Sequence, residues 1–323
     1  MVQAIRVHQT GGPDVLALEE VALGKPARGE IQIQQRAIGV NFIDIYYRTG
    51  AYPMATPFII GNEGAGDVIA VGPGVKDFKV GDRVAYAGPL GGYAEARNLP
   101  VAFAVKLPKT ISYDIGAGMM LKGLTAQYLL RQTYRVKKGD TILVHAAAGG
   151  VGLLLCQWGK ALGATVIGTV GSDEKAKLAK KAGAKHVVNY VTEDFVAHVR
   201  EITKGKLCDV VYDGVGKATF PGSLDCIRPL GMFVSYGSAS GPIDSFNMGM
   251  LAQKGSLYAT RPTLFTYMAE RPRLVKMARD LMRVVGDGRV KIAVSARIPL
   301  ARAAEAHAAL EGRRTTGAIV LLP

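Results

Sequence analysis

One short stretch of the chain has the residue types and spacing of a phosphate-binding loop. Residues 145–152 read HAAAGGVG and can be aligned with the dinucleotide-binding fingerprint as Ala147-x-Gly149-x-x-Gly152, with alanine in place of the first glycine. Small residues are needed there because the chain must turn sharply and approach a pyrophosphate closely. A helix beginning near Gly150 would direct its free N–H groups toward the phosphates. The motif by itself is also compatible with a purely structural turn.

The segments around this loop favour the phosphate-binding interpretation. TILVH before it has the pattern of a buried strand, and GLLLCQWGKALG after it has the pattern of a helix. ATVIGTV then follows as a second strand. Together these segments form a βαβ unit of the expected length, roughly 30 residues.

The end of the second strand indicates which dinucleotide binds. A carboxylate there would hold the ribose 2′-OH of NAD, whereas small or basic residues leave room for the 2′-phosphate of NADP. The strand ends at Val170-Gly171-Ser172, and Lys175 follows one turn later. Asp173 and Glu174 are expected in the first turn of a helix, where carboxylates suit the dipole. We therefore expect NADPH; a strict NAD enzyme, with Asp173 on the ribose, is the alternative.

The rest of the chain indicates two domains with different patterns of predicted secondary structure. The first third is rich in predicted strands, because GEIQIQQRAIGVN alternates Ile31, Ile33 and Ala37 against polar neighbours. From about Ile115 onward, strands alternate with helices, which is typical of a parallel sheet with helices on both faces. After about residue 262 the pattern predicts two helices and a last strand. The predicted fold class is α/β.

Composition and charge narrow the class of function. The formal net charge is +14 over 323 residues, but the Lys and Arg side chains are scattered, which argues against nucleic acid as the main partner. Three widely spaced cysteines without CxxC spacing suit a reducing cytoplasm. Thr141 to Gly159 lacks charged residues but has turn signals in its middle, so we expect no membrane span.

Several motifs in a fixed order resemble the medium-chain dehydrogenase/reductase superfamily, and within it the zeta-crystallin-like quinone oxidoreductases. Besides HAAAGGVG and TVGSDEK, they are AIGVNFIDIYYRTGAYP at 37–53, GNEGAGDV at 61–68, LKGLTA at 121–126, VVYDGVG at 210–216, GSLYATRP at 255–262, and GRRTTGAIVL near the end. The resemblance implies a Rossmann-type doubly wound parallel sheet at 123–262. It also implies a β-rich GroES-like substrate domain at 1–122 and 263–323, with the cofactor in the cleft between the two domains.

The resemblance also points to chemistry without a metal. Zinc-dependent members carry Gly-His-Glu where this chain has Gly61-Asn62-Glu63, and none of its cysteines precedes residue 156. A catalytic zinc needs about three protein ligands, so we expect no zinc site. Without a Lewis acid, an electron-poor conjugated acceptor is favoured, and the family resemblance implies quinone reduction by hydride or single-electron steps.

The resemblance further implies a set of site residues. Tyr46 and Tyr52 are the candidates for a catalytic acid or an orienting group on a quinone oxygen. His145 is expected to be a hydrogen-bonded structural residue rather than a base. The expected cofactor-binding residues are Asn41, Phe42, Ile43, Asp44, Tyr46, Lys122, Thr125, Tyr128, Gly149, Gly150, Val151, Gly171, Ser172, Lys175, Tyr190, Val215, Tyr236, Gly237, Ser238, Arg261 and Arg313.

Two other functions remain open from the sequence. An NADPH-dependent enone or alkenal reductase would use the same hydride donor and a similar cleft. A nonenzymatic RNA-binding or crystallin-like protein could retain NADPH binding, and salt-sensitive RNA binding would favour it. The expected partner of the enzyme is a small quinone, and the resemblance implies a homodimer.

Overall fold

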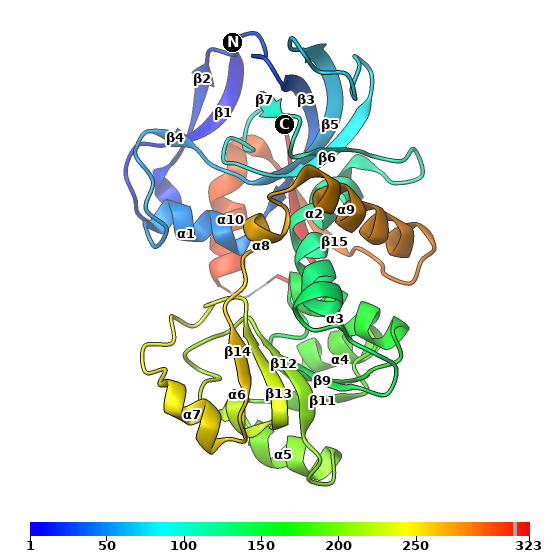
Figure 1. Cartoon of the computed structure of the whole chain (residues 1–323). Coiled ribbons are helices and arrows are strands. Elements are labelled where there is room, and N and C mark those ends of the chain that lie inside the picture. The colour runs from blue at the N-terminus through cyan, green and yellow to red at the C-terminus, as the bar shows by residue number, and fades with distance from the viewer. Residues whose placement is uncertain (313–314) are drawn as a thin grey trace. The chain divides into compact units, whose positions relative to one another are not determined.

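The computed structural model describes residues 1–312 and 315–323 and divides into two compact units. The first unit consists of residues 1–124, 268–286 and 292–323, and the second of residues 125–267 and 287–291. The division falls within one long helix, α2 (Tyr113–Tyr128). Figure 1 shows the helices and strands of each unit.

The second unit is built on a six-stranded sheet with the order β11-β10-β9-β12-β13-β14. All neighbouring strands are parallel, so the predicted Rossmann-type sheet is confirmed. The chain starts in the middle of the sheet and moves outward first to one edge and then to the other. The strands are β9 (Thr141–Val144), β10 (Thr165–Val170), β11 (His186–Asn189), β12 (Cys208–Asp213), β13 (Ile227–Ser235) and β14 (Tyr258–Thr260).

Helices cover both faces of this sheet. On one face, Gly159 of α3 lies against Ile142 and Val166, so close that an added Cβ would be 2.8 Å from the Ile142 side chain. On the other face, α5, α6 and α7 contribute to a core that includes Leu143 and Val211. The helices are α3 (Gly150–Ala161), α4 (Asp173–Lys181), α5 (Phe195–Ile202), α6 (Gly222–Asp225), α7 (Met248–Gln253) and α8 (Leu264–Tyr267), with a π-helical turn, η2 (Leu129–Thr133), after α2.

The first unit contains the expected β-rich domain. A seven-stranded sheet has the order β15-β16-β3-β5-β6-β8, with β7 also paired to β3, and a three-stranded sheet has the order β2-β1-β4. Its strands are β1 (Val2–Val7), β2 (Leu16–Val21), β3 (Glu30–Val40), β4 (Phe58–Ile59), β5 (Glu63–Val71), β6 (Arg83–Ala87), β7 (Ala96–Pro100), β8 (Ala104–Lys106), β15 (Val294–Pro299) and β16 (Ala318–Leu322). The 3-10 turns are η1 (Pro13–Val15) and η3 (Leu300–Arg302).

The alternation that predicted β3 is confirmed, because Ile31, Ile33 and Ala37 are fully buried. The two predicted late helices are also present, as α9 (Arg271–Gly286) and α10 (Ala303–Glu311). The helix α1 (Phe42–Thr49) was not predicted. It forms because Asn41 and Asp44 cap its first turn and Gly50, at φ 80°, ends it in a left-handed conformation.

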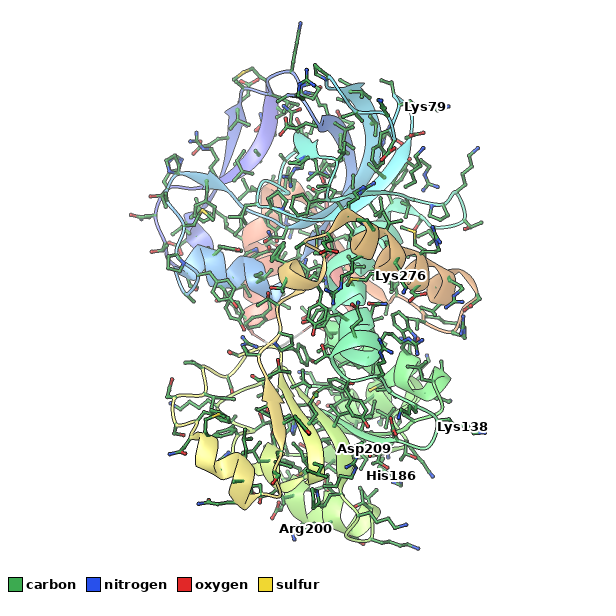
Figure 2. All side chains as sticks on the ribbon, in the orientation of Figure 1. Lys79, Lys138, His186, Arg200, Asp209 and Lys276 are labelled. Atoms are coloured by element: carbon green, nitrogen blue, oxygen red, sulfur yellow. The ribbon has the colours of Figure 1, made fainter. Side chains whose placement is uncertain are left out.

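The basic side chains are dispersed over both units. Lys79 and Lys276 are exposed in the first unit, and Lys138 and Arg200 are exposed in the second (Figure 2). No helix in the part of the chain that the structure describes is long and apolar enough to span a membrane.

Candidate functional site

The loop 145–149 lies where the strand order of the parallel sheet reverses. It follows β9, and β9 is hydrogen-bonded to β10 on one side and to β12 on the other. From β9 the chain goes to β10 and β11, whereas β12, β13 and β14 build the opposite half. In open α/β sheets, ligands bind at the carboxyl ends of the strands at this switch point. The predicted loop therefore has the position of a dinucleotide site.

The small residues of this loop are required by close packing. A Cβ on Gly152 would lie 2.2 Å from the carbonyl oxygen of Ala146, so the helix could not approach the loop with any side chain there. Ala147, in place of the first glycine of the fingerprint, is accommodated by Gly168 of β10, where a Cβ would be 2.7 Å from that of Ala147. The helix α3 begins at Gly150, as predicted, with Gly149 as its N-cap. The cradle therefore fits a pyrophosphate.

The end of β10 brings together three of the residues predicted for the 2′-phosphate and adenosine. Ser172 is the N-cap of α4, and its hydroxyl accepts a hydrogen bond from the backbone N–H of Lys175 at 3.4 Å. A Cβ on Gly171 would lie 3.1 Å from the Tyr190 hydroxyl, so that phenol lies directly beside the end of the strand. Asp173 and Glu174 are in the first helical turn, as predicted. Hydrogen bonds from the backbone N–H of Glu174 itself and then from the Ser172 hydroxyl lower the pKa of Glu174.

A buried carboxylate fixes the loop after β12. Asp213 Oδ1 accepts the backbone N–H groups of Val215 at 2.8 Å and Gly216 at 2.9 Å. Its Oδ2 accepts the hydroxyls of Thr219 at 2.7 Å and Ser223 at 2.9 Å. The predicted cofactor residue Val215 is thereby held at the carboxyl end of its strand, beside the loop after β9.

His145 belongs to the same buried network. Its Nδ1 lies 2.8 Å from the Thr169 hydroxyl and its Nε2 lies 3.0 Å from the Ser223 hydroxyl. Burial lowers the pKa of His145, which favours a neutral ring. The predicted hydrogen bonding of His145 is confirmed.

The loop after β13 carries Tyr236, Gly237 and Ser238, as predicted. Arg261 donates hydrogen bonds to the Ser235 carbonyl at 2.9 Å and to the Ser238 hydroxyl at 3.3 Å. Burial is the main cause that raises the pKa of the Tyr236 phenol, with Asp213 adding to it. The segments after β9, β10, β11, β12, β13 and β14 therefore gather the predicted residues of the second unit, apart from those on α2, at one edge of the sheet.

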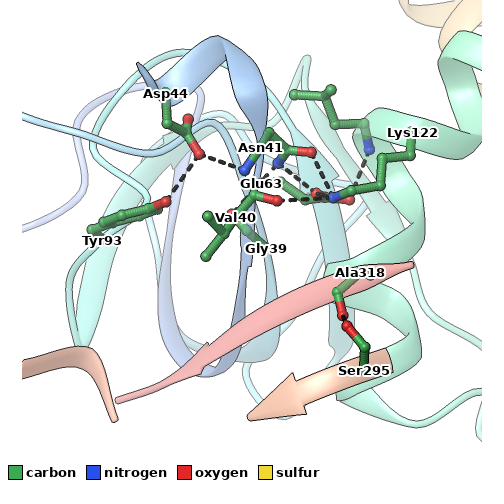
Figure 3. Close-up of polar contacts among 10 residues, drawn as sticks. Gly39, Val40, Asn41, Asp44, Glu63, Tyr93, Lys122, Ser295 and Ala318 are labelled. Carbon is green, nitrogen blue, oxygen red and sulfur yellow. Dashed lines mark hydrogen bonds and ion pairs between the residues drawn. The ribbon is translucent and has the colours of Figure 1, made fainter. Parts of the chain in front are cut away.

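In the first unit, Asn41 and Lys122 meet in a buried polar cluster together with Glu63 (Figure 3). Lys122 Nζ donates to Asn41 Oδ1 at 2.6 Å and to the Val40 carbonyl at 3.0 Å, and it lies 3.4 Å from Glu63 Oε2. Asn41 Nδ2 donates to the same Glu63 oxygen at 2.7 Å. Three acceptors thus surround the ammonium group of Lys122 inside this unit.

Asp44 caps the helix that follows Asn41. Its Oδ2 accepts the backbone N–H of Asn41 at 2.8 Å and the Tyr93 hydroxyl at 3.0 Å (Figure 3). Its Oδ1 is buried without a hydrogen-bond partner. Burial is the main cause that raises the pKa of Asp44 to about 7, although both hydrogen bonds and the charge of Lys122 oppose the shift.

The two candidate catalytic tyrosines lie together near α1. The ring centroids of Tyr46 and Tyr52 are 5.1 Å apart, and those of Phe42 and Tyr46 are 5.4 Å apart. Tyr52 is 37% exposed, whereas Tyr46, Phe42 and Ile43 are half-buried. A solvent-facing aromatic group of this kind can contact a planar ligand.

Two predicted cofactor residues on α2 are buried. Thr125 is 8% exposed and Tyr128 is 2% exposed. The Tyr128 ring stacks on that of Tyr267 with the centroids 4.4 Å apart, which leaves little of the ring for a ligand. Arg313 lies outside the described residues.

The sequence analysis missed Glu63, Tyr93 and Asp213. Glu63 and Tyr93 bond to groups from distant segments, so no local pattern indicates them. The signal for Asp213 was its position directly after the buried run VVY at the end of a strand. For Glu63, the signal was its place beside Asn62, where zinc-dependent dehydrogenases carry a ligand.

The described residues contain no group of three or more His, Cys, Asp or Glu side chains placed to hold a metal ion. At the motif position, Asn62 donates its amide to the Gly88 carbonyl at 2.8 Å, and its own oxygen is buried without a partner. An amide with this contact does not have the donor chemistry of a zinc ligand.

Comparisons with known proteins agree with this geometry. Residues 27–109 match the family model "Alcohol dehydrogenase GroES-like domain", and residues 150–275 match "Zinc-binding dehydrogenase". The chain is 52% identical to a quinone oxidoreductase of Pseudomonas aeruginosa, and the alignment covers 100% of both chains. It is 48% identical to a 2-haloacrylate reductase of Burkholderia, and that alignment covers 100% of this chain and 99% of the relative. It is also similar to the solved Escherichia coli quinone oxidoreductase complexed with NADPH, at a TM-score of 0.98 and 48% identity over 99% of this chain and 100% of that one.

Proposed function

The chain belongs to the quinone oxidoreductases of the medium-chain dehydrogenase/reductase superfamily, and from this premise we propose that it reduces quinones with NADPH. The observation that carries the proposal is the Gly152 cradle at the switch point of the sheet, next to a strand end without a carboxylate. NADPH, when bound, supplies the hydride or the electrons that pass to a conjugated carbonyl acceptor.

The second unit supplies the residues that bind the cofactor's phosphates. The backbone N–H groups of Gly150 and Val151, at the start of α3, bind the pyrophosphate because they have no partner within the helix. Ser172 and Lys175 bind the 2′-phosphate, and Tyr190 packs near the adenosine. Val215, Tyr236, Gly237, Ser238 and Arg261 complete this side of the site, supported by their positions on neighbouring loops.

The first unit supplies the groups around the nicotinamide and the quinone. Asn41, Phe42, Ile43 and Tyr46 lie at the start of α1, where a planar ligand can pack against aromatic and aliphatic side chains. Tyr46 and Tyr52 orient the quinone oxygen or provide its proton, and the exposed position of Tyr52 supports this role. Positioning of the reactants in a dry site supplies much of the rate enhancement. That the cofactor lies in a cleft between the units stays a prediction.

Lys175→Ala is expected to weaken NADPH binding by about ten-fold or more, because one charge-assisted hydrogen bond contributes roughly 1.5–3 kcal/mol. NADH binding should change little, because NADH has no 2′-phosphate. Both dissociation constants can be measured by the fluorescence of the reduced nicotinamide. Lys177→Ala is the matched control, because it removes the same charge from an exposed position of α4. Equal losses with both cofactors would contradict the assignment.

A reductase of α,β-unsaturated carbonyl compounds is the second candidate. The 48% identity to the Burkholderia 2-haloacrylate reductase favours it, because that relative is named for a conjugated substrate. Both reactions use the same hydride donor and need no metal to activate the acceptor. The relative turnover of a quinone and an α,β-unsaturated ketone separates them.

We further propose a homodimer formed in the second unit. Within the described residues, β14 pairs only with β13 and so leaves an open edge of the parallel sheet. Tyr258 on this strand is 60% exposed, and Met248 on α7 is 73% exposed. Light scattering should give about twice the chain mass of 34.2 kDa; the mass of a single chain would contradict the dimer.

A cytoplasmic location is proposed as well, supported by three buried cysteines with free thiols.

A further inference from the structure

The side chain of Glu63, at the start of β5, joins three segments of the first unit. Its Oε1 accepts the backbone N–H of Leu121 in α2 at 2.8 Å. Its Oε2 accepts Asn41 Nδ2 at 2.7 Å and lies 3.4 Å from Lys122 Nζ (Figure 3). Glu63 is fully buried, so these contacts replace all of its hydration. One carboxylate therefore connects β5, α2 and the residue that precedes α1.

The space for this carboxylate is kept free by Gly39. A Cβ at this position would lie 2.3 Å from Glu63 Oε2 and 2.2 Å from the carbonyl oxygen of Ala117. Any larger residue at position 39 would displace the carboxylate or α2. The close approach of β3 to α2 at Gly39 thus restricts the position of Glu63 in addition to its hydrogen bonds.

The amide of Asn41 is fixed from two sides by its charged neighbours. Its Nδ2 donates to Glu63, and its Oδ1 accepts from Lys122, so the opposite charges of the pair determine which way the amide points. The backbone N–H of Asn41 is meanwhile held by Asp44. Asn41 is the N-cap of α1, and this helix carries Phe42, Ile43 and Tyr46. Glu63 and Lys122 therefore hold the side chain of the residue at which this helix begins.

We propose that Glu63 is a positioning residue for quinone reduction, acting through Asn41 and Lys122. This inference rests on the proposed function, because it assigns the start of α1 to the nicotinamide end of the site. A displacement of about 1 Å among reacting groups can lower a rate about 100-fold. The carboxylate prevents such a displacement by holding Asn41 and Lys122 in one arrangement. Glu63 itself is fully buried and contacts neither cofactor nor substrate in this role.

Glu63→Gln tests the proposal because the glutamine retains the shape of the side chain but removes its charge. The glutamine cannot accept all three hydrogen bonds, and the Lys122 ammonium loses its buried counter-charge. We expect kcat with a quinone to fall about 10- to 100-fold. The dissociation constant of NADPH should change less than about three-fold, because the phosphate contacts that dominate it lie in the second unit. NADPH fluorescence measures binding without any quinone, so binding and kcat are obtained separately.

The double variant Glu63→Gln/Lys122→Met separates positioning from stability. It removes both charges of the buried pair, so no unpaired charge remains in the interior. We therefore expect the Tm of the double variant to be closer to the wild-type Tm than the Tm of Glu63→Gln is. Its kcat should nevertheless remain low, because Asn41 has lost both of its charged partners. Asp67→Asn is the matched control on the same strand, where the carboxylate pairs with the exposed Arg36, and its kcat should equal that of the wild type.

Each other outcome contradicts the proposal in a distinguishable way. A wild-type kcat in Glu63→Gln or in the double variant would show that the pair positions nothing that the reaction needs. Parallel losses of kcat and NADPH binding that follow the folded fraction would reduce Glu63 to a structural residue. A wild-type protein that binds NADPH but turns over no quinone would overturn the proposed function and, with it, this inference.

Discussion

Gly152→Ala is expected to abolish measurable NADPH binding, with a loss of about 100-fold or more. The added Cβ would lie 2.2 Å from the Ala146 carbonyl oxygen and 2.9 Å from two backbone atoms of Ala147. Backbone atoms cannot move aside as a flexible side chain can, so α3 or the loop must shift. The N–H groups at the start of α3 would then miss the pyrophosphate, and several charge-assisted hydrogen bonds would be lost together.

Isothermal titration with NADPH measures this loss directly, and circular dichroism shows whether the sheet and helices remain. Gly286→Ala is the matched control, because no atom beyond its chain neighbours and the nearby backbone of its own helix lies within 4 Å of a Cβ added at this position. It should bind NADPH as the wild type does. Normal NADPH affinity in Gly152→Ala would show that the loop after β9 is a structural turn and that the cofactor binds elsewhere.

The second large effect is a pH-dependent change in stability at Asp44. Burial raises the pKa of this carboxyl to about 7 in the folded protein, against 3.8 as its ordinary value. The folded state therefore holds the proton of Asp44 more tightly than the unfolded state does. The contribution of this proton to the free energy of unfolding is fully present below about pH 4 and declines as the pH rises toward 7. An asparagine keeps the shape and does not titrate. As the pH rises from 4 to 8, the free energy of unfolding of Asp44→Asn should therefore increase relative to that of the wild type by on the order of 4 kcal/mol.

Urea unfolding of both proteins at a series of pH values measures this difference. Asp77→Asn changes an exposed aspartate of the same unit and should follow the pH dependence of the wild type. A stability difference between Asp44→Asn and the wild type that stays constant from pH 4 to pH 8 would contradict a buried, protonated Asp44. The hydrogen bonds from Asn41 and Tyr93 would then stabilise the ionised form more than burial opposes it.

The central strands of the second unit and the loop after β9 could be predicted from the sequence, because their determinants are local, whereas β14 and the short helices α6, α7 and α8 were not predicted. HAAAGGVG lies between a strand and a helix, and its small residues match the requirement for close approach at Gly152. Ser172 precedes two acids, which is a helix N-terminus signal that needs no tertiary information. The structure adds the reason that alanine is allowed at position 147, because Gly168 of the neighbouring strand leaves room for it.

The polar cluster of the first unit could not be predicted in the same way. Glu63 contacts Asn41, Lys122 and Leu121, which lie 22, 59 and 58 residues away in the sequence. A single sequence gives no indication that a carboxylate so far from a lysine is its partner. The helix α1 was not predicted because its β-branched and aromatic residues favour a strand and follow directly on the long strand β3. Its cap at Asn41 and Asp44 was the available signal.

Quinone turnover with NADPH, after removal of metals by a chelator, tests the central claim most directly. The oxidation of NADPH and of NADH is followed with 1,4-benzoquinone, a larger naphthoquinone and an α,β-unsaturated ketone. We expect rapid NADPH oxidation with the quinones, much slower oxidation of NADH, and no loss of rate in the chelator-treated protein. Tight NADPH binding without quinone turnover, or turnover that returns only when zinc is added, would contradict the claim that this chain is a metal-independent NADPH:quinone reductase.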